Sequence, residues 1–168
     1  MARRVFFSFH YDKDVWRANQ VRNCNVIAGA DTAGFFDHSE YLEAKKQGSE
    51  AIKRMILRHL KNTSVTVVLI GEETASRPWV KYEIEQSIAR NNGLLGIYIH
   101  HLKATLARAA LGLCSRGPKP TVPYVVEFPT YDWDSDLDRF RNAIEAAGKR
   151  SDDSLAAERV RAALFGRR

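Results

Sequence analysis

The stretch Ser64-Val-Thr-Val-Val-Leu-Ile70 decides the fold of this 168-residue chain. It is a continuous run of β-branched and apolar residues, which is typical of a strand buried on both faces of a parallel sheet. A similar run, Leu94-Leu-Gly-Ile-Tyr-Ile99, follows it along the chain, and another, Val5-Phe-Phe-Ser-Phe9, precedes it. These three runs predict neighbouring strands in the middle of a parallel sheet.

Helical patterns separate the three runs. They extend from about residue 12 to 23, from 40 to 60 at the 3.6-residue period, and from 79 to 90 behind Pro78, which fits a first helical position. Phe35-Phe36 is expected to be a short further strand or its remnant. The alternation of strands and helices predicts an α/β fold with an open, mostly parallel sheet covered by helices on both faces.

The chain past His100 is less regular. We expect, in order, a helix-bearing insert over 101–120, a last strand over 122–128 and two helices at about 133–147 and 152–165. No internal repeat interrupts the pattern, so a single domain is predicted over residues 1–168.

Composition narrows the class of protein. Hydrophobic residues make up 45% of the chain and charged residues 27%, the balance of a globular protein. No stretch approaches the ~20 apolar residues of a spanning helix, and the beginning of the chain turns polar too early for a secretory signal. We therefore expect a cytoplasmic protein with no membrane partner. Cys24 and Cys114 lie far apart without ligand spacing, so neither a metal site nor a disulfide framework is predicted.

The chain is basic, with 26 Lys and Arg against 20 Asp and Glu, a formal net charge of +6. Such a charge raises nucleic acid as a partner. The basic residues are scattered along the predicted helices, however, which argues against nucleic acid and favours attraction of a small anionic ligand.

A candidate site follows from the predicted sheet. Ligands of such sheets bind outside the carboxyl ends of the strands. On a helical wheel over 79–90, Glu85 faces solvent, whereas Glu83 lies one turn after Trp79, between the packed and the exposed surface. Taken alone this is a weak signal, because a glutamate early in a helix is also favoured by the helix dipole.

Three linear patterns resemble the TIR-like domain family, in particular its members in bacterial Thoeris anti-phage systems. They are Arg4-Val-Phe-Phe-Ser-Phe-His-Tyr11, Asn62-Thr-Ser-Val-Thr-Val-Val-Leu-Ile-Gly71 and Trp79-Val-Lys-Tyr-Glu-Ile84, and the strand at 96–99 follows them. The match covers roughly residues 3 to 103. The resemblance implies a flavodoxin-like sheet and, in catalytic members, cleavage of NAD at the nicotinamide–ribose bond by the glutamate of a Trp-x-x-x-Glu pattern. Here that glutamate is Glu83.

The resemblance also implies a role in defence. A phage-derived trigger would start synthesis of a cyclic ADP-ribose isomer, which activates a separate NAD-consuming effector protein. NAD is then a substrate, and neither a cofactor nor a metal is expected. Residues 104–168 match poorly and form a variable C-terminal part. The resemblance therefore does not indicate where the infection-sensing surface lies or whether the protein forms a homo-oligomer.

The chemistry fits the residues. Loss of nicotinamide leaves positive charge on the ribose, which a nearby carboxylate can stabilise. Phe9, Tyr11 or Trp79 can stack on a ring. The loop at 9–14 opens a helix whose amide groups, with Lys13 and Arg17, suit a pyrophosphate.

Two further residues are candidates for substrate binding. His10 either caps a backbone group or contacts the ligand. Asp37 follows Phe35-Phe36 at a strand end and is expected to close the site.

Two other functions are weighed against this one. A TIR-like domain can be an assembly module without turnover, its basic loops forming a protein interface. A flavin-binding or phosphoacceptor domain of the same fold is disfavoured, because no Ser/Thr/Gly-rich phosphate loop follows Phe9 and the first strand ends in Ser-Phe-His rather than in an acidic cluster.

Overall fold

A computed structural model describes residues 3–24, 38–103 and 114–165 of the chain. In this part of the chain, parallel strands form one sheet in the order β1-β2-β3-β4. They are β1 (Val5–Ser8), β2 (Val65–Ile70), β3 (Gly93–Tyr98) and β4 (Thr130–Asp132). The three predicted strands are therefore confirmed as parallel neighbours, with Val65 of β2 opposite Val5 of β1 and Gly93 of β3.

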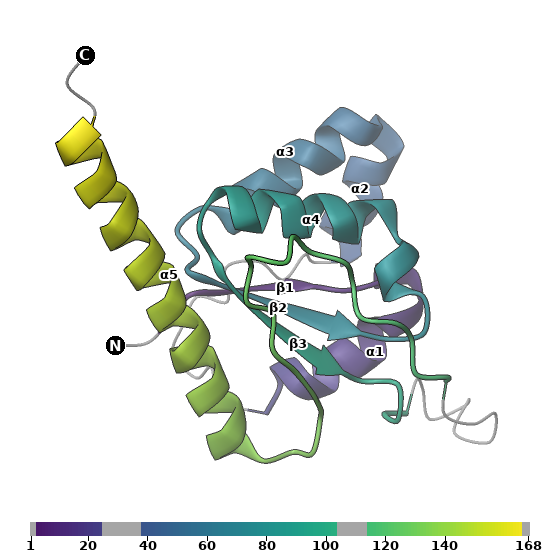
Figure 1. Ribbon diagram of the computed structural model, residues 1–168. Coiled ribbons are helices and arrows are strands. Elements are labelled where there is room, and N and C mark those ends of the chain that lie inside the picture. Colours follow the sequence, from purple (N-terminus) through teal and green to yellow (C-terminus); the bar gives the residue numbers. More distant parts are fainter. Residues whose placement is uncertain (1–2, 25–37, 104–113, 166–168) are drawn as a thin grey trace.

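Helices cover both faces of the sheet (Figure 1). They are α1 (Tyr11–Arg22), α2 (His38–Gln47), α3 (Ser49–Leu60), α4 (Pro78–Ala89) and α5 (Leu137–Phe165), with a short 3-10 helix η1 (Thr74–Ser76) before α4. The α/β prediction, with helices on both sides, is confirmed.

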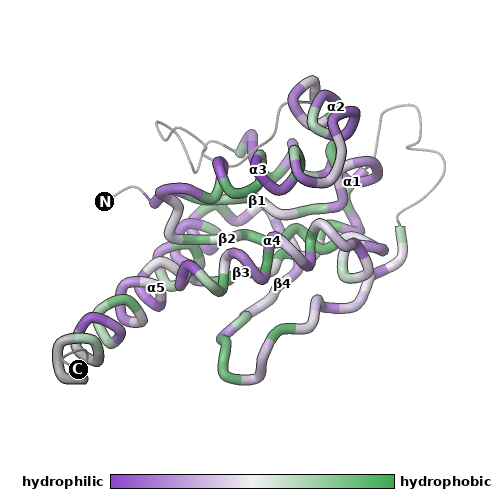
Figure 2. Tube along the Cα trace, turned by 90° about the horizontal axis from the view of Figure 1, so that it is seen from above, coloured by the Kyte–Doolittle hydropathy of each residue, from purple (hydrophilic) through white to green (hydrophobic). Residues whose placement is uncertain are grey.

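The apolar run of β2 has a partner on each side. Its Val65, Val67 and Leu69 pack with α1 and α5, whereas Val68 and Ile70 pack with α4. Along the helices of both layers, hydrophilic and hydrophobic residues alternate (Figure 2). This is expected when each helix packs one face on the sheet and exposes the other to solvent. No described helix has the length and apolar character needed to cross a membrane.

The single helix predicted over 40–60 is wrong, because the chain breaks at Gly48 into α2 and α3. Gly48 has φ 99° and ψ −177°, a backbone conformation that favours glycine. Its N–H donates to the carbonyl of Ala44, and its own carbonyl accepts from Ile52. Ala44 and Met55 pack into one apolar cluster on either side of the break, so the hydrophobic pattern gives no sign of it.

The last strand predicted over 122–128 is also wrong. The strand beside β3 is β4, which begins after Pro129, and Val125 is exposed in a loop while Phe128 packs in the core. Between Pro123 and Pro129 the backbone forms a turn instead of a strand, in which the Val126 N–H donates to the carbonyl of Pro123.

The two helices predicted near the C-terminus are one helix, α5. Gly148 lies between the two predicted ranges, where a Cβ would lie 2.4 Å from Nε of Arg3. The glycine thus makes room for the Arg3 side chain and does not end the helix. The expected strand at Phe35-Phe36 and residues 104–113 of the predicted insert lie outside the described residues; residues 114–120 carry no helix.

Candidate active site

A cavity of about 250 Å³ lies where β1 ends and where α1 and α4 begin. It is lined by five of the residues proposed from the sequence: Phe9, His10, Tyr11, Trp79 and Glu83. These distant segments therefore meet at one cavity. This follows from the parallel pairing of β1 and β2, which brings the loops after both strands to one edge of the sheet.

Glu83 is the most buried titratable group in this lining, with 5% of its surface exposed. Burial raises the pKa of its carboxyl to about 8, and the hydrogen bond from Ser8, which lowers that pKa, opposes the shift only in part. Oγ of Ser8 lies 2.5 Å from Oε2 of Glu83. A pKa near 8 favours the neutral carboxyl at pH 7, and the side chain lies deeper than the helical wheel predicted.

A chain of buried hydroxyl groups fixes α4 on the sheet. Oγ of Ser87 donates to the backbone carbonyl of Glu83 at 2.7 Å, and Oγ1 of Thr66 on β2 donates to Oγ of Ser87 at 2.8 Å. Val80 and Ile84 pack beside them in the core. The turn of α4 that carries Glu83 is thereby held against the sheet.

Aromatic rings form one wall of the cavity. The rings of Tyr11 and Tyr41 stack with centroids 4.5 Å apart, and those of Phe9 and Tyr11 with centroids 5.7 Å apart. Trp79 is half-buried and meets Tyr82 edge-on. Flat aromatic faces of this kind suit a planar ring of a ligand. Tyr41 was not singled out in the sequence, so its place in the lining was missed.

His10 occupies the N-cap position of α1 without a side-chain capping hydrogen bond. It is 8% exposed, and its Nδ1 is buried with no hydrogen-bond partner among the described residues. Burial, and secondarily the charge of Arg77, lowers the pKa of the ring. His10 thus presents a neutral imidazole to the cavity, and of the two roles weighed from the sequence the capping one is not observed.

Two cations, Arg77 and Lys45, line the cavity, and a third, Lys13, shares a carboxylate partner with Arg77. Lys13 and Arg77 both pair with Glu73. Nζ of Lys45 lies 3.8 Å from Oδ2 of Asp12. Arg77 and Lys45 line the cavity but were not singled out in the sequence; the position of Arg77, directly before the proline that begins α4, was the available signal.

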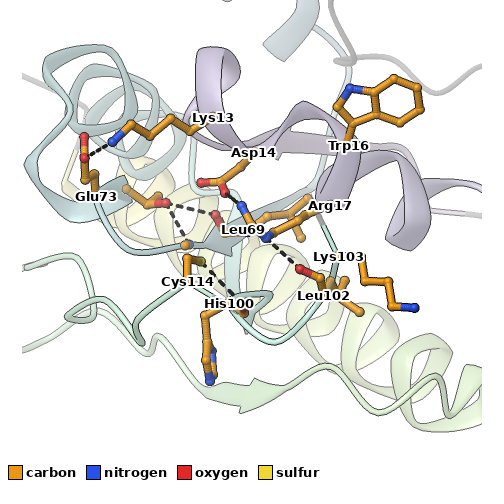
Figure 3. Close-up of polar contacts among 12 residues, drawn as sticks. Lys13, Asp14, Trp16, Arg17, Leu69, Glu73, His100, Leu102, Lys103 and Cys114 are labelled. Carbon is orange, nitrogen blue, oxygen red and sulfur yellow. Dashed lines mark hydrogen bonds and ion pairs between the residues drawn. The ribbon is translucent and has the colours of Figure 1, made fainter. Parts of the chain in front are cut away.

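Arg17 does not line the cavity. Its Nη1 donates to Oδ1 of Asp14 at 2.9 Å and its Nε donates to the carbonyl of Leu102 at 2.8 Å (Figure 3). Both members of this ion pair are buried. Arg17 therefore connects α1 to the chain after β3, and the geometry does not favour its predicted contact with a pyrophosphate. Asp37, the last candidate, lies outside the described residues.

Gly71 marks how closely the loop after β2 approaches this ion pair. A Cβ at Gly71 would lie 2.3 Å from Oδ2 of Asp14. Only glycine fits there without moving the carboxylate. Among the described residues, no group of His, Cys, Asp and Glu side chains could hold a metal ion.

Comparison with known proteins identifies the family. Residues 6–104 match the TIR-like domain of the Thoeris protein ThsB. The chain belongs to this family. The matched range of the ThsB TIR-like domain contains every residue that lines the cavity around Glu83.

A curated relative comes from Bacillus cereus (strain MSX-D12) and is named "Putative cyclic ADP-D-ribose synthase ThsB1". It is 46% identical over 122 residues, which amount to 71% of this chain and 62% of the relative. The present chain thus spans less than two thirds of the length of that ThsB protein.

Proposed function

We propose that this ThsB-family protein cleaves NAD at the nicotinamide–ribose bond and closes the remaining ADP-ribose into a cyclic isomer. The product would act in the cytoplasm as a second messenger that activates an NAD-depleting effector during phage infection. The observation that carries the proposal is the buried Glu83 carboxyl in an aromatic cavity, at the position of the glutamate in the Trp-x-x-x-Glu pattern. The name of the relative supports the same class of product.

The proposed reaction breaks the bond between C1′ of the ribose and the ring nitrogen of nicotinamide. The electron pair leaves with nicotinamide, whose ring becomes neutral, and positive charge develops on the ribose. A nucleophilic atom of the adenosine half then forms the new bond to C1′ and releases a proton. Nicotinamide needs no protonation to leave, so a single carboxylate is sufficient.

Glu83 would act in its ionised form. Burial raises the pKa of its carboxyl to about 8, which favours the neutral form at pH 7. The nicotinamide ring of NAD carries a positive charge, and an opposite charge nearby favours the ionised carboxylate. Substrate binding therefore promotes the charge that stabilises the oxocarbenium-like state, and the low polarity of the cavity strengthens this interaction.

The size of the cavity indicates how the dinucleotide would bind. At about 250 Å³ it lies below the ~300–1,000 Å³ of common ligand pockets, so it suits the nicotinamide ribose and not the whole of NAD. Arg77 in the lining and Lys13, which pairs with the same Glu73, together with the amide groups that begin α1, then suit the pyrophosphate. In this arrangement Arg77 takes the place that the sequence suggested for Arg17.

We further propose that turnover begins only when a phage-derived trigger is present. The test is incubation of purified protein with NAD, with and without lysate of infected cells, followed by mass spectrometry of the nucleotides. A cyclic ADP-ribose isomer is expected with trigger in the wild-type protein, and none in Glu83→Gln.

Three results would contradict parts of the proposal. Linear ADP-ribose alone would exclude cyclisation. Equal rates in the wild-type protein and Glu83→Gln would remove the catalytic assignment. Absence of turnover under every triggered condition would favour the non-catalytic assembly module.

A further inference from the structure

Ser8 is a hydroxyl-bearing residue in a strand of large apolar side chains. It ends β1 between Phe7 and Phe9 and is completely buried. A buried hydroxyl group destabilises the fold unless it forms a hydrogen bond. Its partner is Glu83, 75 residues later in the chain, with 2.5 Å between Ser8 Oγ and Glu83 Oε2.

We propose that Ser8 is a positioning residue for Glu83: its hydroxyl group holds Oε2 in place, leaves Oε1 for the ligand, and favours the ionised carboxylate. This inference rests on the proposed function, in which that carboxylate stabilises the charge on the ribose.

The strand geometry explains why position 8 can do this. Side chains alternate between the faces of a strand, so Ser8 shares its face with Phe6, which packs against α3, and not with Phe7, which packs with α1 and α5. The face of Phe6 is the one toward which α4 turns Glu83. An apolar side chain at position 8 would leave Oε2 without this donor.

The donor acts selectively on one protonation state. A hydroxyl group that donates to a carboxylate stabilises the charged form more than the neutral form, since hydrogen bonds to ionised groups are the stronger ones. In the balance at Glu83, burial raises the pKa and the Ser8 hydrogen bond lowers it. Loss of the Ser8 hydroxyl group should therefore raise the pKa of Glu83 further.

Other titratable groups face the same cavity and remain in place in every variant compared below. They are His10 before α1, Tyr11 and Asp12 on α1, Tyr41 and Lys45 on α2, and Arg77 before α4. Because these groups are common to all variants, differences between variants report the serine alone.

Ser87 provides a matched control. It is also a completely buried serine that hydrogen-bonds to Glu83, but its Oγ donates to the backbone carbonyl and not to the carboxyl group. Ser87→Ala removes the same atom as Ser8→Ala at the same degree of burial. It should lower thermal stability without changing the titration of the carboxyl group.

The first measurement needs no NAD. The carbon-13 resonance of the Glu83 carboxyl group, identified by its absence in Glu83→Gln, is followed against pH in the full chain. We expect a wild-type midpoint near 8, a midpoint roughly one pH unit higher in Ser8→Ala, and a near-wild-type midpoint in Ser8→Thr, which keeps the hydroxyl group. An unchanged midpoint in Ser8→Ala, or an equal shift in Ser87→Ala, would overturn the proposal.

The second measurement is the pH profile of kcat/KM. A shift of one pH unit leaves about tenfold less ionised carboxylate at neutral pH, so Ser8→Ala should lose about tenfold at pH 7 and recover as the pH rises. A loss that is equal at every pH would mean a merely structural role and contradict the inference. If the wild-type protein turns over no NAD, the proposed function fails, while the titration still decides the relation between Ser8 and Glu83.

Discussion

Glu83 and Glu85 lie two residues apart on α4, and the helix buries the first and exposes the second. One faces the aromatic cavity beside Ser8, and the other faces solvent. The two side chains are chemically identical but lie in different surroundings. Replacing each by glutamine therefore separates the effect of a carboxyl group in the cavity from the effect of losing one negative charge on α4.

Glu83→Gln should reduce nicotinamide release from NAD by a factor of about 10² or more, because loss of a preorganised charge at the developing cation costs about 3 kcal/mol. Glu85→Gln, made in parallel, should keep the wild-type rate. Rates are measured on triggered protein by chromatography of nicotinamide. A protein inactivated by the change at Glu85 but not at Glu83 would show that α4 is rotated from the orientation described.

The pH profile of the wild-type enzyme should follow Glu83. Since kcat/KM reports the ionisation of the free enzyme, it should rise with pH and reach half its plateau near pH 8. The profile is measured at low NAD concentration across pH 6 to 9.5. A profile that is flat across this range would mean that ionisation of Glu83 does not limit the reaction.

The same carboxyl group should make the protein less stable as the pH rises. The pKa of Glu83 is raised from its ordinary value of 4.5 to about 8, so between these values the native state binds a proton that the unfolded state has lost. The group's contribution to the free energy of unfolding is full below about pH 4.5 and falls by about 1.4 kcal/mol per unit until about pH 8. Glu83→Gln removes this dependence.

Thermal unfolding of the two proteins from pH 5 to pH 9 tests this linkage. The Tm of Glu83→Gln minus that of the wild-type protein should increase with pH and become constant above about pH 8, because the other titrating groups are shared. A difference that stays constant throughout would mean that Glu83 is ionised well below pH 8.

Arg17 and Arg77 should differ in what their loss changes. Arg17→Met leaves Asp14 buried without its partner and should destabilise the fold by about 3 kcal/mol or more, with KM for NAD unchanged in the folded protein. Arg77 is in a partly exposed pair at the rim of the cavity, so Arg77→Met should raise KM and change the Tm little. If instead Arg17→Met raised KM and Arg77→Met lowered the Tm, the sequence-based prediction that Arg17 binds the pyrophosphate would be restored.

The sheet and the phase of α4 could be predicted because each depends on a pattern local in sequence. The run Ser64–Ile70 is apolar throughout since helices cover it on both sides. Val80 and Ile84 are buried, which fixes the rotation of α4 about its axis. With 3.6 residues per turn, Glu83 then faces the sheet and Glu85 faces solvent.

The errors arose where a residue's role depends on a distant partner. The two helices predicted over 133–147 and 152–165 are one helix, in which Gly148 makes room for Arg3. Arg17 looks like a free cation but is paired within the fold. Ser8 is the hydroxyl-bearing residue in an apolar strand, which was a usable signal, although Glu83 could be named as its partner only from the structure.

The parallel pairing of β1 with β2 has a consequence for protein synthesis. Val5 pairs with Val65 across the sheet, and the Ser8–Glu83 contact joins residues 75 apart, so the cavity as a whole forms only when distant segments have come together. Long-range pairing of this kind forms slowly compared with local structure. On the proposed function, a chain still being synthesised has no assembled site, because Glu83 reaches Ser8 and the aromatic residues only after α4 has been made and has packed on the sheet.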